Sequence, residues 1–474
     1  MLTLADVLEA LTGKRIFGAV AAVSKAVVDS RQVSPGCMFV AISGERTDGH
    51  EFVHEAFERG AALALVQKEI SSQFPQLDLT TELQLPDETW FGNSPIVLRV
   101  PDSLAALQAI ARFWRRKLDL RVIGITGSVG KSTTKELVAD VLGQRYRTLK
   151  NEGNLNNEIG LPLTLLSLTE DHEHAVLEMG FYVPGEIRFL CDLALPQIGV
   201  ITNVGEAHAE RAGSLKAIAQ GKAELVQSLP AAPEGVAILN LDDPLVRKMA
   251  DQTQASVFFY GLNSQADLWA DGVEGLGLEG IRFRLHYQNE SLYLKVPLIG
   301  RHSVHTALRA AAVGLVEGLS WQEIVEGLRS GHSQLRLVAV RAESGALILD
   351  DTYNASPQSS LAALNLLDEL DGRKVAVLGD MLELGQYEHL GHEMVGARAA
   401  EIVDELITVG ERGRIIASAA SDAGLDLHRI VQVADSQEAT AYLRERLGSE
   451  DVVLVKGSRG MRMDLIVAAL EAGK

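Results

Sequence analysis

The chain has 474 residues, more than one hydrophobic core usually supports, so two or three domains are expected. Its 44 basic and 63 acidic side chains give a formal charge of -19, which argues against nucleic acid as a main partner. The two cysteines, Cys37 and Cys191, are far apart and lack a C-x-x-C spacing, so neither a disulfide framework nor a zinc site is indicated.

Residues 1–100 are expected to form a first domain. Acids follow Met1 where a signal peptide would carry bases, and no apolar run approaches the roughly 18 residues of a membrane span, so we expect a cytoplasmic protein that is not integral to a membrane. Short strands are predicted at residues 37–42 and 62–66, and the poorly patterned residues 67–95 are interpreted as a variable surface segment. A one-sided apolar helix at residues 101–116 places a boundary near residue 100.

An apolar run at residues 122–126 turns at glycines into a helix that begins with a lysine and hydroxyls. Gly127 and Gly130 let backbone N–H groups approach an anion at the positive end of the helix. Lys131 would reach the outer phosphates, and Ser132 would ligate magnesium. The common pattern would place its first glycine on Ile125, and an ordinary glycine-rich turn is the alternative. The segment predicts a nucleotide-binding loop made of Thr126, Gly127, Ser128, Val129, Gly130, Lys131, Ser132 and Thr133.

The central region, residues 101–330, alternates strands with helices. Strands are expected at residues 122–126, 175–178, 198–203 and 236–239, which predicts a parallel sheet covered by helices on both faces. Short alternating runs between residues 268 and 297 predict antiparallel strands added to this sheet. A helix at about residues 304–318 closes the domain.

Two candidate metal ligands follow strands of this sheet. Glu178 and His208 would face the same rim as Lys131, because ligands bind beyond the carboxyl ends of parallel strands. A carboxylate and an imidazole near a triphosphate suit divalent cations that bridge its phosphates. Taken alone, either residue is just as well an ordinary surface side chain.

Lys222 occupies an unusual place on a helix predicted over residues 214–229. It shares the inner apolar stripe with Ile218 and Leu225. The commoner explanation is that its stem packs while the ammonium reaches solvent. The other explanation is a partly buried amine of lowered pKa that is available to react.

An asparagine-rich segment follows the loop helix. Residues 151–157 hold four side-chain amides, which suit uncharged polar groups of a ligand, and an asparagine-rich turn is the alternative.

Residues 331–474 show a second alternation, with strands expected at 346–349, 374–378, 406–409, 430–433 and 452–455. They predict a doubly wound, Rossmann-like domain. It has no phosphate loop, so a nucleotide would be shared with the central domain across a cleft. Arg336 is a candidate for phosphate and Asp351 for ribose hydroxyls, while a helix capped by Asp351 or Ser356 is the alternative.

Together these segments resemble the Mur ligase family of peptidoglycan synthesis over nearly the whole chain. The motifs are Asp29-Ser-Arg, Asp48-Gly-His, Gly127-Ser-Val-Gly-Lys-Ser, Gly153-Asn-Leu-Asn-Asn-Glu, Leu177-Glu-Met-Gly, Gly221-Lys-Ala-Glu, Asp350-Asp-Thr-Tyr-Asn-Ala-Ser-Pro, Gly379-Asp-Met-Leu-Glu-Leu-Gly and Lys456-Gly-Ser-Arg. The resemblance implies three α/β domains: a uridine-nucleotide-binding domain, a central ATPase-like domain and a C-terminal ligase domain.

The resemblance also implies the reaction, most closely that of the family member acting on D-alanyl-D-alanine. It implies an ATP-dependent amide ligase that joins this dipeptide to UDP-N-acetylmuramoyl-tripeptide through an acyl phosphate, with ATP and magnesium bound. We expect a monomer. The sequence does not tell whether lysine or diaminopimelate is the third residue of the peptide.

Residue roles follow from the same resemblance. Glu178 and His208 would ligate magnesium, and Lys222 matches the family's carbamylated lysine, whose negative charge suits a metal site. With Lys131 these form the expected catalytic set. Substrate contacts are implied for Ser30, Arg31, Asn154, Asn157, Tyr353, Asn354 and Ser356, and ATP contacts for His302, Arg336 and Asp351. The family's usual His-Asn-x-x-Asn is His302-Ser-Val-His-Thr here, so the amides expected for adenine are replaced at Ser303 and Thr306.

Three alternatives are weaker. A sister ligase that adds the diamino acid typically carries Asp-Asn-Pro-Arg, which is absent from this chain. A folylpolyglutamate synthetase would resemble only the last two domains. A catalytically silent nucleotide-binding scaffold is disfavoured because the expected catalytic set is retained.

Overall fold

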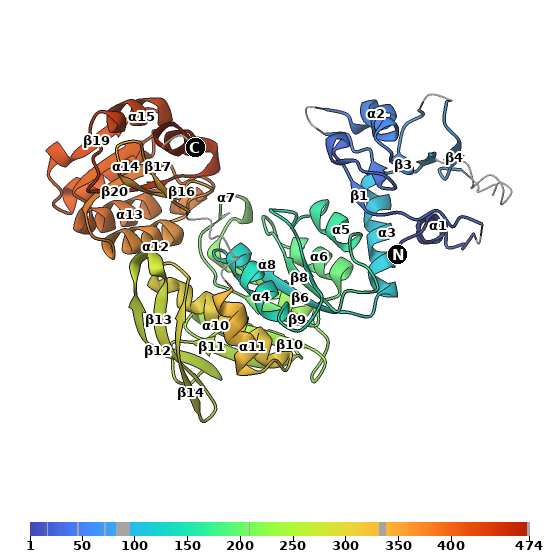
Figure 1. The fold of residues 1–474 in the computed structure, drawn as a ribbon, viewed down its shortest axis with the longest axis horizontal. Coiled ribbons are helices and arrows are strands. Elements are labelled where there is room, and N and C mark those ends of the chain that lie inside the picture. Colours follow the sequence, from blue (N-terminus) through green and yellow to red (C-terminus); the bar gives the residue numbers. More distant parts are fainter. Residues whose placement is uncertain are drawn as a thin grey trace. The chain divides into compact units, whose positions relative to one another are not determined.

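A computed structural model describes residues 1–16, 18–44, 47–70, 73–81, 95–207, 209–330 and 338–471. In these ranges the chain forms three β-sheets whose strands alternate with helices (Figure 1). The predicted α/β class is confirmed.

The first sheet has five strands in the order β1-β2-β3-β5-β4, all paired in parallel. Its elements are α1 (Leu4–Thr12), β1 (Ala26–Val27), β2 (Met38–Val40), α2 (Val53–Glu58), β3 (Leu63–Val66), β4 (Gln76–Asp78), β5 (Ile96–Arg99) and α3 (Ser103–Lys117). Strand β4 lies in the segment interpreted as variable surface, so that interpretation is wrong for these three residues. Only Leu77 of β4 is buried, which leaves almost no apolar pattern to detect.

The second sheet has nine strands in the order β14-β13-β12-β11-β10-β9-β6-β8-β7. Its strands are β6 (Arg121–Thr126), β7 (Thr148–Lys150), β8 (His174–Glu178), β9 (Ile198–Ile201), β10 (Val236–Asn240), β11 (Ser256–Gly261), β12 (Leu268–Gly275), β13 (Ile281–Tyr287) and β14 (Glu290–Val296). Its helices are α4 (Lys131–Leu142), α5 (Gly160–Leu165), α6 (Glu186–Ala194), α7 (Ala209–Ala212), α8 (Leu215–Gln227), α9 (Pro244–Arg247), α10 (Val304–Val316) and α11 (Trp321–Arg329). The strands from β12 to β14 are antiparallel neighbours, as predicted.

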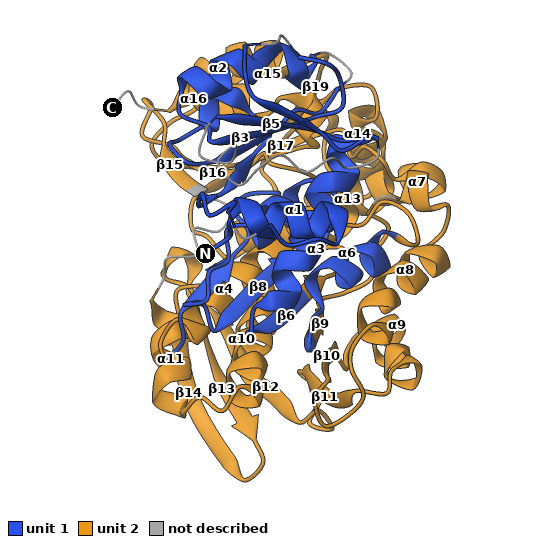
Figure 2. Ribbon diagram, turned by 90° about the vertical axis from the view of Figure 1, so that its right-hand side faces the viewer, with its two compact units in different colours: residues 1–124, 146–180, 186–198 blue, residues 125–145, 181–185, 199–474 orange. Residues whose placement is uncertain are grey.

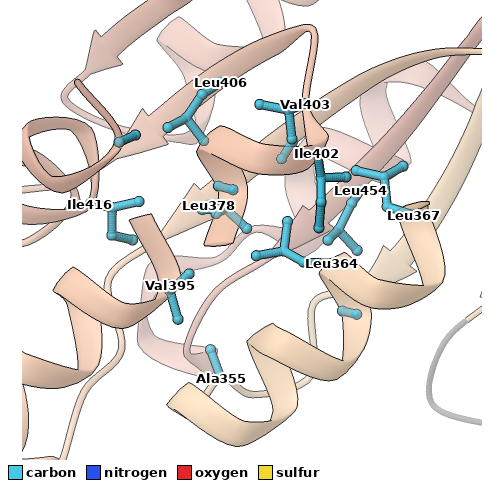
Figure 3. Packing of buried hydrophobic residues seen from close by; sticks show 14 of the residues in the cluster. Ala355, Leu364, Leu367, Leu378, Val395, Ile402, Val403, Leu406, Ile416 and Leu454 are labelled. Atoms are coloured by element: carbon cyan, nitrogen blue, oxygen red, sulfur yellow. The ribbon is translucent and has the colours of Figure 1, made fainter. Parts of the chain in front are cut away.

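The third sheet has six strands in the order β15-β16-β20-β17-β18-β19, and only the β15–β16 pair is antiparallel. Its elements are β15 (Val338–Arg341), β16 (Leu347–Asp351), α12 (Pro357–Asp368), β17 (Arg373–Gly379), α13 (Glu388–Ile402), β18 (Glu405–Val409), α14 (Gly413–Asp422), β19 (Ile430–Val433), α15 (Ser436–Arg444), β20 (Asp451–Lys456) and α16 (Asp464–Leu470). Apolar side chains of α12 and α13 pack on one face of the strands; Leu364 of α12 and Val395 of α13 lie in one cluster with Leu454 of β20 (Figure 3). The predicted Rossmann-like domain is confirmed.

The chain divides into two compact units (Figure 2). One unit comprises residues 1–124, 146–180 and 186–198, and the other comprises residues 125–145, 181–185 and 199–474. The predicted domain boundaries at residues 100 and 330 stay predictions. Among the described residues, no helix combines the length and the apolar composition that a membrane span requires.

Candidate active site

The predicted nucleotide-binding loop lies between β6 and α4. Thr126 at the end of β6 is fully buried, and Gly130 caps α4 with a φ of 82°. Gly127 has a φ of 149°, and a Cβ there would lie 1.8 Å from Thr202 Oγ1. The loop therefore needs glycine at position 127 for both its backbone conformation and its packing, and it leads into the positive end of α4.

Residues that follow β9 hold the loop from the side. The Ser128 backbone N–H donates to the Asn203 carbonyl (3.0 Å), and the Val129 N–H donates to Asn203 Oδ1 (2.9 Å). The Thr202 hydroxyl donates to the Val129 carbonyl (2.7 Å). Ser128 Oγ in turn bonds to Gly205 N and O. Asn203 was not among the predicted site residues, although it fixes two residues of the loop.

Lys131 opens α4 and turns back over the loop. Its ammonium donates to the carbonyls of Gly127 (2.9 Å) and Ser128 (3.3 Å). Ser132 and Thr133 follow on the first turn and are partly exposed. The lysine and the two hydroxyls thus lie at the loop, where the sequence predicted them.

Lys222 is buried in α8 with 1% of its surface exposed. Its Nζ lies 4.8 Å from the centre of the Phe181 ring, which packs against the helix at Gly221. Burial, followed by the charge of Lys131, holds the pKa of Lys222 well below its ordinary value. Within the described part of the chain, no hydrogen bond or ion pair joins the Lys222 amine to another group. The explanation by a solvent-reaching ammonium is therefore wrong. The amine is buried and its pKa is lowered, as the other explanation held, and its availability to react stays a prediction.

Glu178 ends β8 in the other compact unit and is 2% exposed. The Asn156 side chain donates to its Oε1 (2.8 Å). Asn151 Oδ1 accepts from the Glu178 backbone N–H (2.9 Å), and its Nδ2 donates to the Glu178 and Leu155 carbonyls. Asn156, which was not predicted as a site residue, therefore orients the carboxylate, and Asn151 fixes the backbone behind it.

The two asparagines predicted to contact substrate lie nearby in the sequence. Asn157 Oδ1 accepts from the Gly160 N–H (2.9 Å), so this side chain stabilises the turn into α5. The Asn154 side chain is exposed. The turn interpretation thus accounts for Asn157, and the substrate role of both residues stays a prediction.

The predicted magnesium ligands can be judged by the chemistry that the ion prefers. His208 and Arg336 lie outside the described residues. Among the residues that are described, no group of three His, Cys, Asp or Glu side chains is placed to hold a metal ion. Two predicted magnesium ligands are described: the buried carboxylate of Glu178 in one compact unit and the hydroxyl of Ser132 in the other. Each is an oxygen donor, the class of ligand that magnesium prefers, and magnesium typically takes one or two carboxylates and completes its shell with water and phosphate oxygens.

The side chains that replace the expected adenine amides, Ser303 and Thr306, form hydrogen bonds within the protein. The Ser303 hydroxyl donates to the Ile299 carbonyl (2.7 Å), and the Thr306 hydroxyl accepts from Arg309 (2.7 Å). His302 is exposed.

Asp351 ends β16 directly beside Lys456 of β20. Lys456 is 2% exposed, and its ammonium donates to Asp351 Oδ2 (2.6 Å) and to the Asn354 carbonyl (2.9 Å). Ser356 caps α12, as the alternative reading predicted, and Tyr353 is 41% exposed. Lys456 was not predicted as a site residue, although a lysine at the end of an apolar strand was a signal for it.

In the first unit, Asp29 caps a short helix that contains Ser30 and Arg31. Ser30 is buried, and Arg31 makes a bidentate pair with Asp29 (2.9 and 2.7 Å). This pair holds the pKa of Asp29 below its ordinary value.

Comparison with known proteins covers nearly the whole chain. Family profiles described as "Mur ligase family, catalytic domain", "Mur ligase middle domain" and "Mur ligase, glutamate ligase domain" match residues 24–115, 125–314 and 335–459. The UDP-N-acetylmuramoyl-tripeptide--D-alanyl-D-alanine ligase of Bacillus subtilis (strain 168) is 36% identical over 93% of this chain and 92% of its own length. A crystal structure of MurF from Acinetobacter baumannii is similar with a TM-score of 0.82 and 29% identity, covering 98% of this chain and 97% of that one. The MurF ligase of Thermotoga maritima in complex with ADP is similar with a TM-score of 0.77 and 26% identity, over 94% and 97%.

Proposed function

The chain belongs to the Mur ligase family, and we propose that it joins D-alanyl-D-alanine to UDP-N-acetylmuramoyl-tripeptide at the expense of ATP. The observation that carries the proposal is the loop of residues 126–133 with the buried amine of Lys222, in a chain 36% identical to a ligase of that name. Full-length similarity makes a folylpolyglutamate synthetase or a silent scaffold a poorer account. We further propose that it acts in the cytoplasm.

The reaction consists of two transfers. A carboxylate oxygen of the tripeptide attacks the γ-phosphorus of ATP, and ADP leaves. The amine of D-alanyl-D-alanine then attacks the carbonyl carbon of the acyl phosphate, loses a proton, and expels inorganic phosphate. The loop and Lys131 would bind the triphosphate and neutralise the charge that moves during the first transfer.

The other candidate residues have distinct tasks in this proposal. Glu178, Ser132 and His208 would hold magnesium, which neutralises phosphate charge when bound. Asp351, fixed by Lys456, would bind the nucleotide from the C-terminal domain, together with Arg336. Substrate contacts are proposed for Ser30, Arg31, Asn154, Asn157, Tyr353, Asn354 and Ser356, and a further ATP contact for His302.

Lys222 is proposed to carry a carbamate. A neutral, buried amine can add carbon dioxide, and the product is an anion suited to a site that binds cations. Support comes from its burial, its lowered pKa and the lack of an acidic partner among the described residues. The carbamate would orient a bound magnesium ion.

The decisive experiment measures phosphate release by the purified full chain with ATP and magnesium. We expect release only when both UDP-N-acetylmuramoyl-tripeptide and D-alanyl-D-alanine are present. Release that proceeds equally well without the dipeptide would refute the proposal. Release with the UDP-N-acetylmuramoyl-dipeptide and a diamino acid would support the sister ligase instead.

A further inference from the structure

Arg309 is a buried arginine on α10 behind the nucleotide-binding loop. Its surface is 4% exposed. The guanidinium donates from Nε to Thr134 Oγ1 (2.8 Å), from Nη1 to the Tyr260 hydroxyl (3.3 Å) and from Nη2 to Thr306 Oγ1 (2.7 Å). All three acceptors are neutral hydroxyls.

No acid compensates this charge within the described part of the chain, where no carboxylate lies within 4.0 Å of the guanidinium. Two acids on the loop after β10 have other partners. Asp242 accepts from His305 and from the backbone N–H of Leu262, and Asp243 accepts from backbone N–H groups, including that of Val204. Burial of a cation without a counter-ion carries a desolvation penalty that neutral hydroxyls offset only in part.

The guanidinium lies directly against the loop. A Cβ on Gly130 would lie 3.2 Å from Arg309 Nη2. Thr134, which accepts from Arg309, donates its own hydroxyl hydrogen to the Gly130 carbonyl (2.6 Å). Arg309 therefore contacts both the first turn of α4 and the glycine that caps it, from the buried side of the helix.

We propose that Arg309 is a positioning residue for the nucleotide, whose triphosphate supplies the negative charge that no described acidic side chain provides. The inference rests on the proposed ATP site. Thr306, which stands where the family usually has an amide, orients the guanidinium rather than reading a base. Arg309 thereby adds a fixed positive charge behind the loop to that of Lys131 in front of it.

Calorimetric titration of the full chain without peptide substrates tests this. Arg309→Met should weaken ATP binding about tenfold or more and should weaken ADP binding less, because the effect depends on the charge of the ligand. Adenosine binding, measured by competition, should not change. Arg309→Lys should retain part of the affinity for ATP. The thermal midpoint of the ligand-free Arg309→Met chain should stay level or rise, because an uncompensated buried charge is replaced by an apolar group.

Arg145→Met is the matched control. Arg145 lies just beyond the C-terminal end of α4, the helix that follows the loop. It is about 18 Å from the loop by the rise of a 12-residue helix, and it pairs with Glu323. Its loss should leave nucleotide affinity unchanged. Unaltered ATP affinity of Arg309→Met, or an equal loss for adenosine, would overturn the inference. If the unaltered chain itself fails to bind ATP, the proposed function fails instead.

Discussion

Gly127→Ala should damage the loop that the proposed reaction depends on. The added methyl would lie 1.8 Å from Thr202 Oγ1 and 2.9 Å from Thr202 Cβ, so Thr202 or the loop must move. Movement of Thr202 breaks its hydrogen bond to Val129, which costs about 1 kcal/mol. Overpacking adds about 1–3 kcal/mol and the positive φ about 1 kcal/mol, for a total of about 3–5 kcal/mol if the backbone stays in place.

We therefore expect the thermal midpoint of Gly127→Ala to fall by about 5–10 °C and ADP affinity to fall at least about tenfold, measured by scanning calorimetry and by titration calorimetry. Gly213→Ala is the control, because Gly213 also has a positive φ, 87°, but no atom lies within 4 Å of its added methyl. Gly213→Ala should lower the free energy of unfolding only by the contribution of the positive φ, and it should leave ADP affinity unchanged. A Gly127→Ala chain with the same thermal midpoint and the same ADP affinity as the unaltered chain would refute the packing argument.

Three further predictions concern single side chains. Lys222→Ala should abolish phosphate release, with partial recovery on addition of carbon dioxide or a short carboxylate, and full activity of the variant would exclude the carbamate. Asn156→Ala should raise the magnesium concentration needed for half-maximal activity about tenfold, because Glu178 loses its orienting amide; an unchanged magnesium dependence would contradict this. Asp6→Asn should lower the free energy of unfolding by about 2 kcal/mol at pH 7, because the carboxylate loses its charged hydrogen bonds. Burial alone would raise the pKa of Asp6, but the hydrogen bonds, led by that from Lys117, hold this pKa well below its ordinary range. A carboxyl of lowered pKa stabilises the fold above its unfolded pKa of about 4 and loses this effect as pH falls, so urea titrations should show the difference shrinking below about pH 4; a constant difference would contradict the assignment.

Local patterns were enough to predict most of the fold. The strand at residues 122–126 is an apolar run, whereas the helix around Lys222 and the antiparallel strands after residue 268 have apolar residues at the period of their element. The structure contains each of them. Strand β11 was missed although residues 257–260 form an apolar run that favours a strand; only Tyr260 and Gly261 of its six residues are buried in the structure. Strand β7 was missed because it is only three residues long and none of the three is fully buried, which leaves no apolar pattern to detect.

The site was predicted less completely, because its supporting contacts join distant parts of the chain. Asn203 holds Val129 across 74 residues, and Arg309 holds Thr134 across 175. No local spacing indicates such pairs. Lys222 is the intermediate case, because helix periodicity placed it on the inner face but only packing against Phe181 shows that its amine stays inside.

Three buried cations, Lys456, Lys222 and Arg309, differ in how their charge is compensated. Lys456 is compensated by Asp351, as a structural cation would be. Lys222 and Arg309 have no such acid among the described residues, although the chain holds 63 acidic side chains from which one could have been placed there. Buried Arg115 also lacks an acid within 4.0 Å among these residues, but it donates to the backbone carbonyls of Ala194, Leu118 and Leu120. Lys222 and Arg309 have no carbonyl partner in the described part of the chain, and desolvated groups of this kind cluster at functional sites. The two differ in how the charge can be relieved: the amine of Lys222 can lose its proton and add carbon dioxide, whereas a guanidinium stays charged and needs an anion. For Arg309 that anion is the nucleotide, so its substitution should change binding, whereas substitution of Lys222 should chiefly change the chemical step.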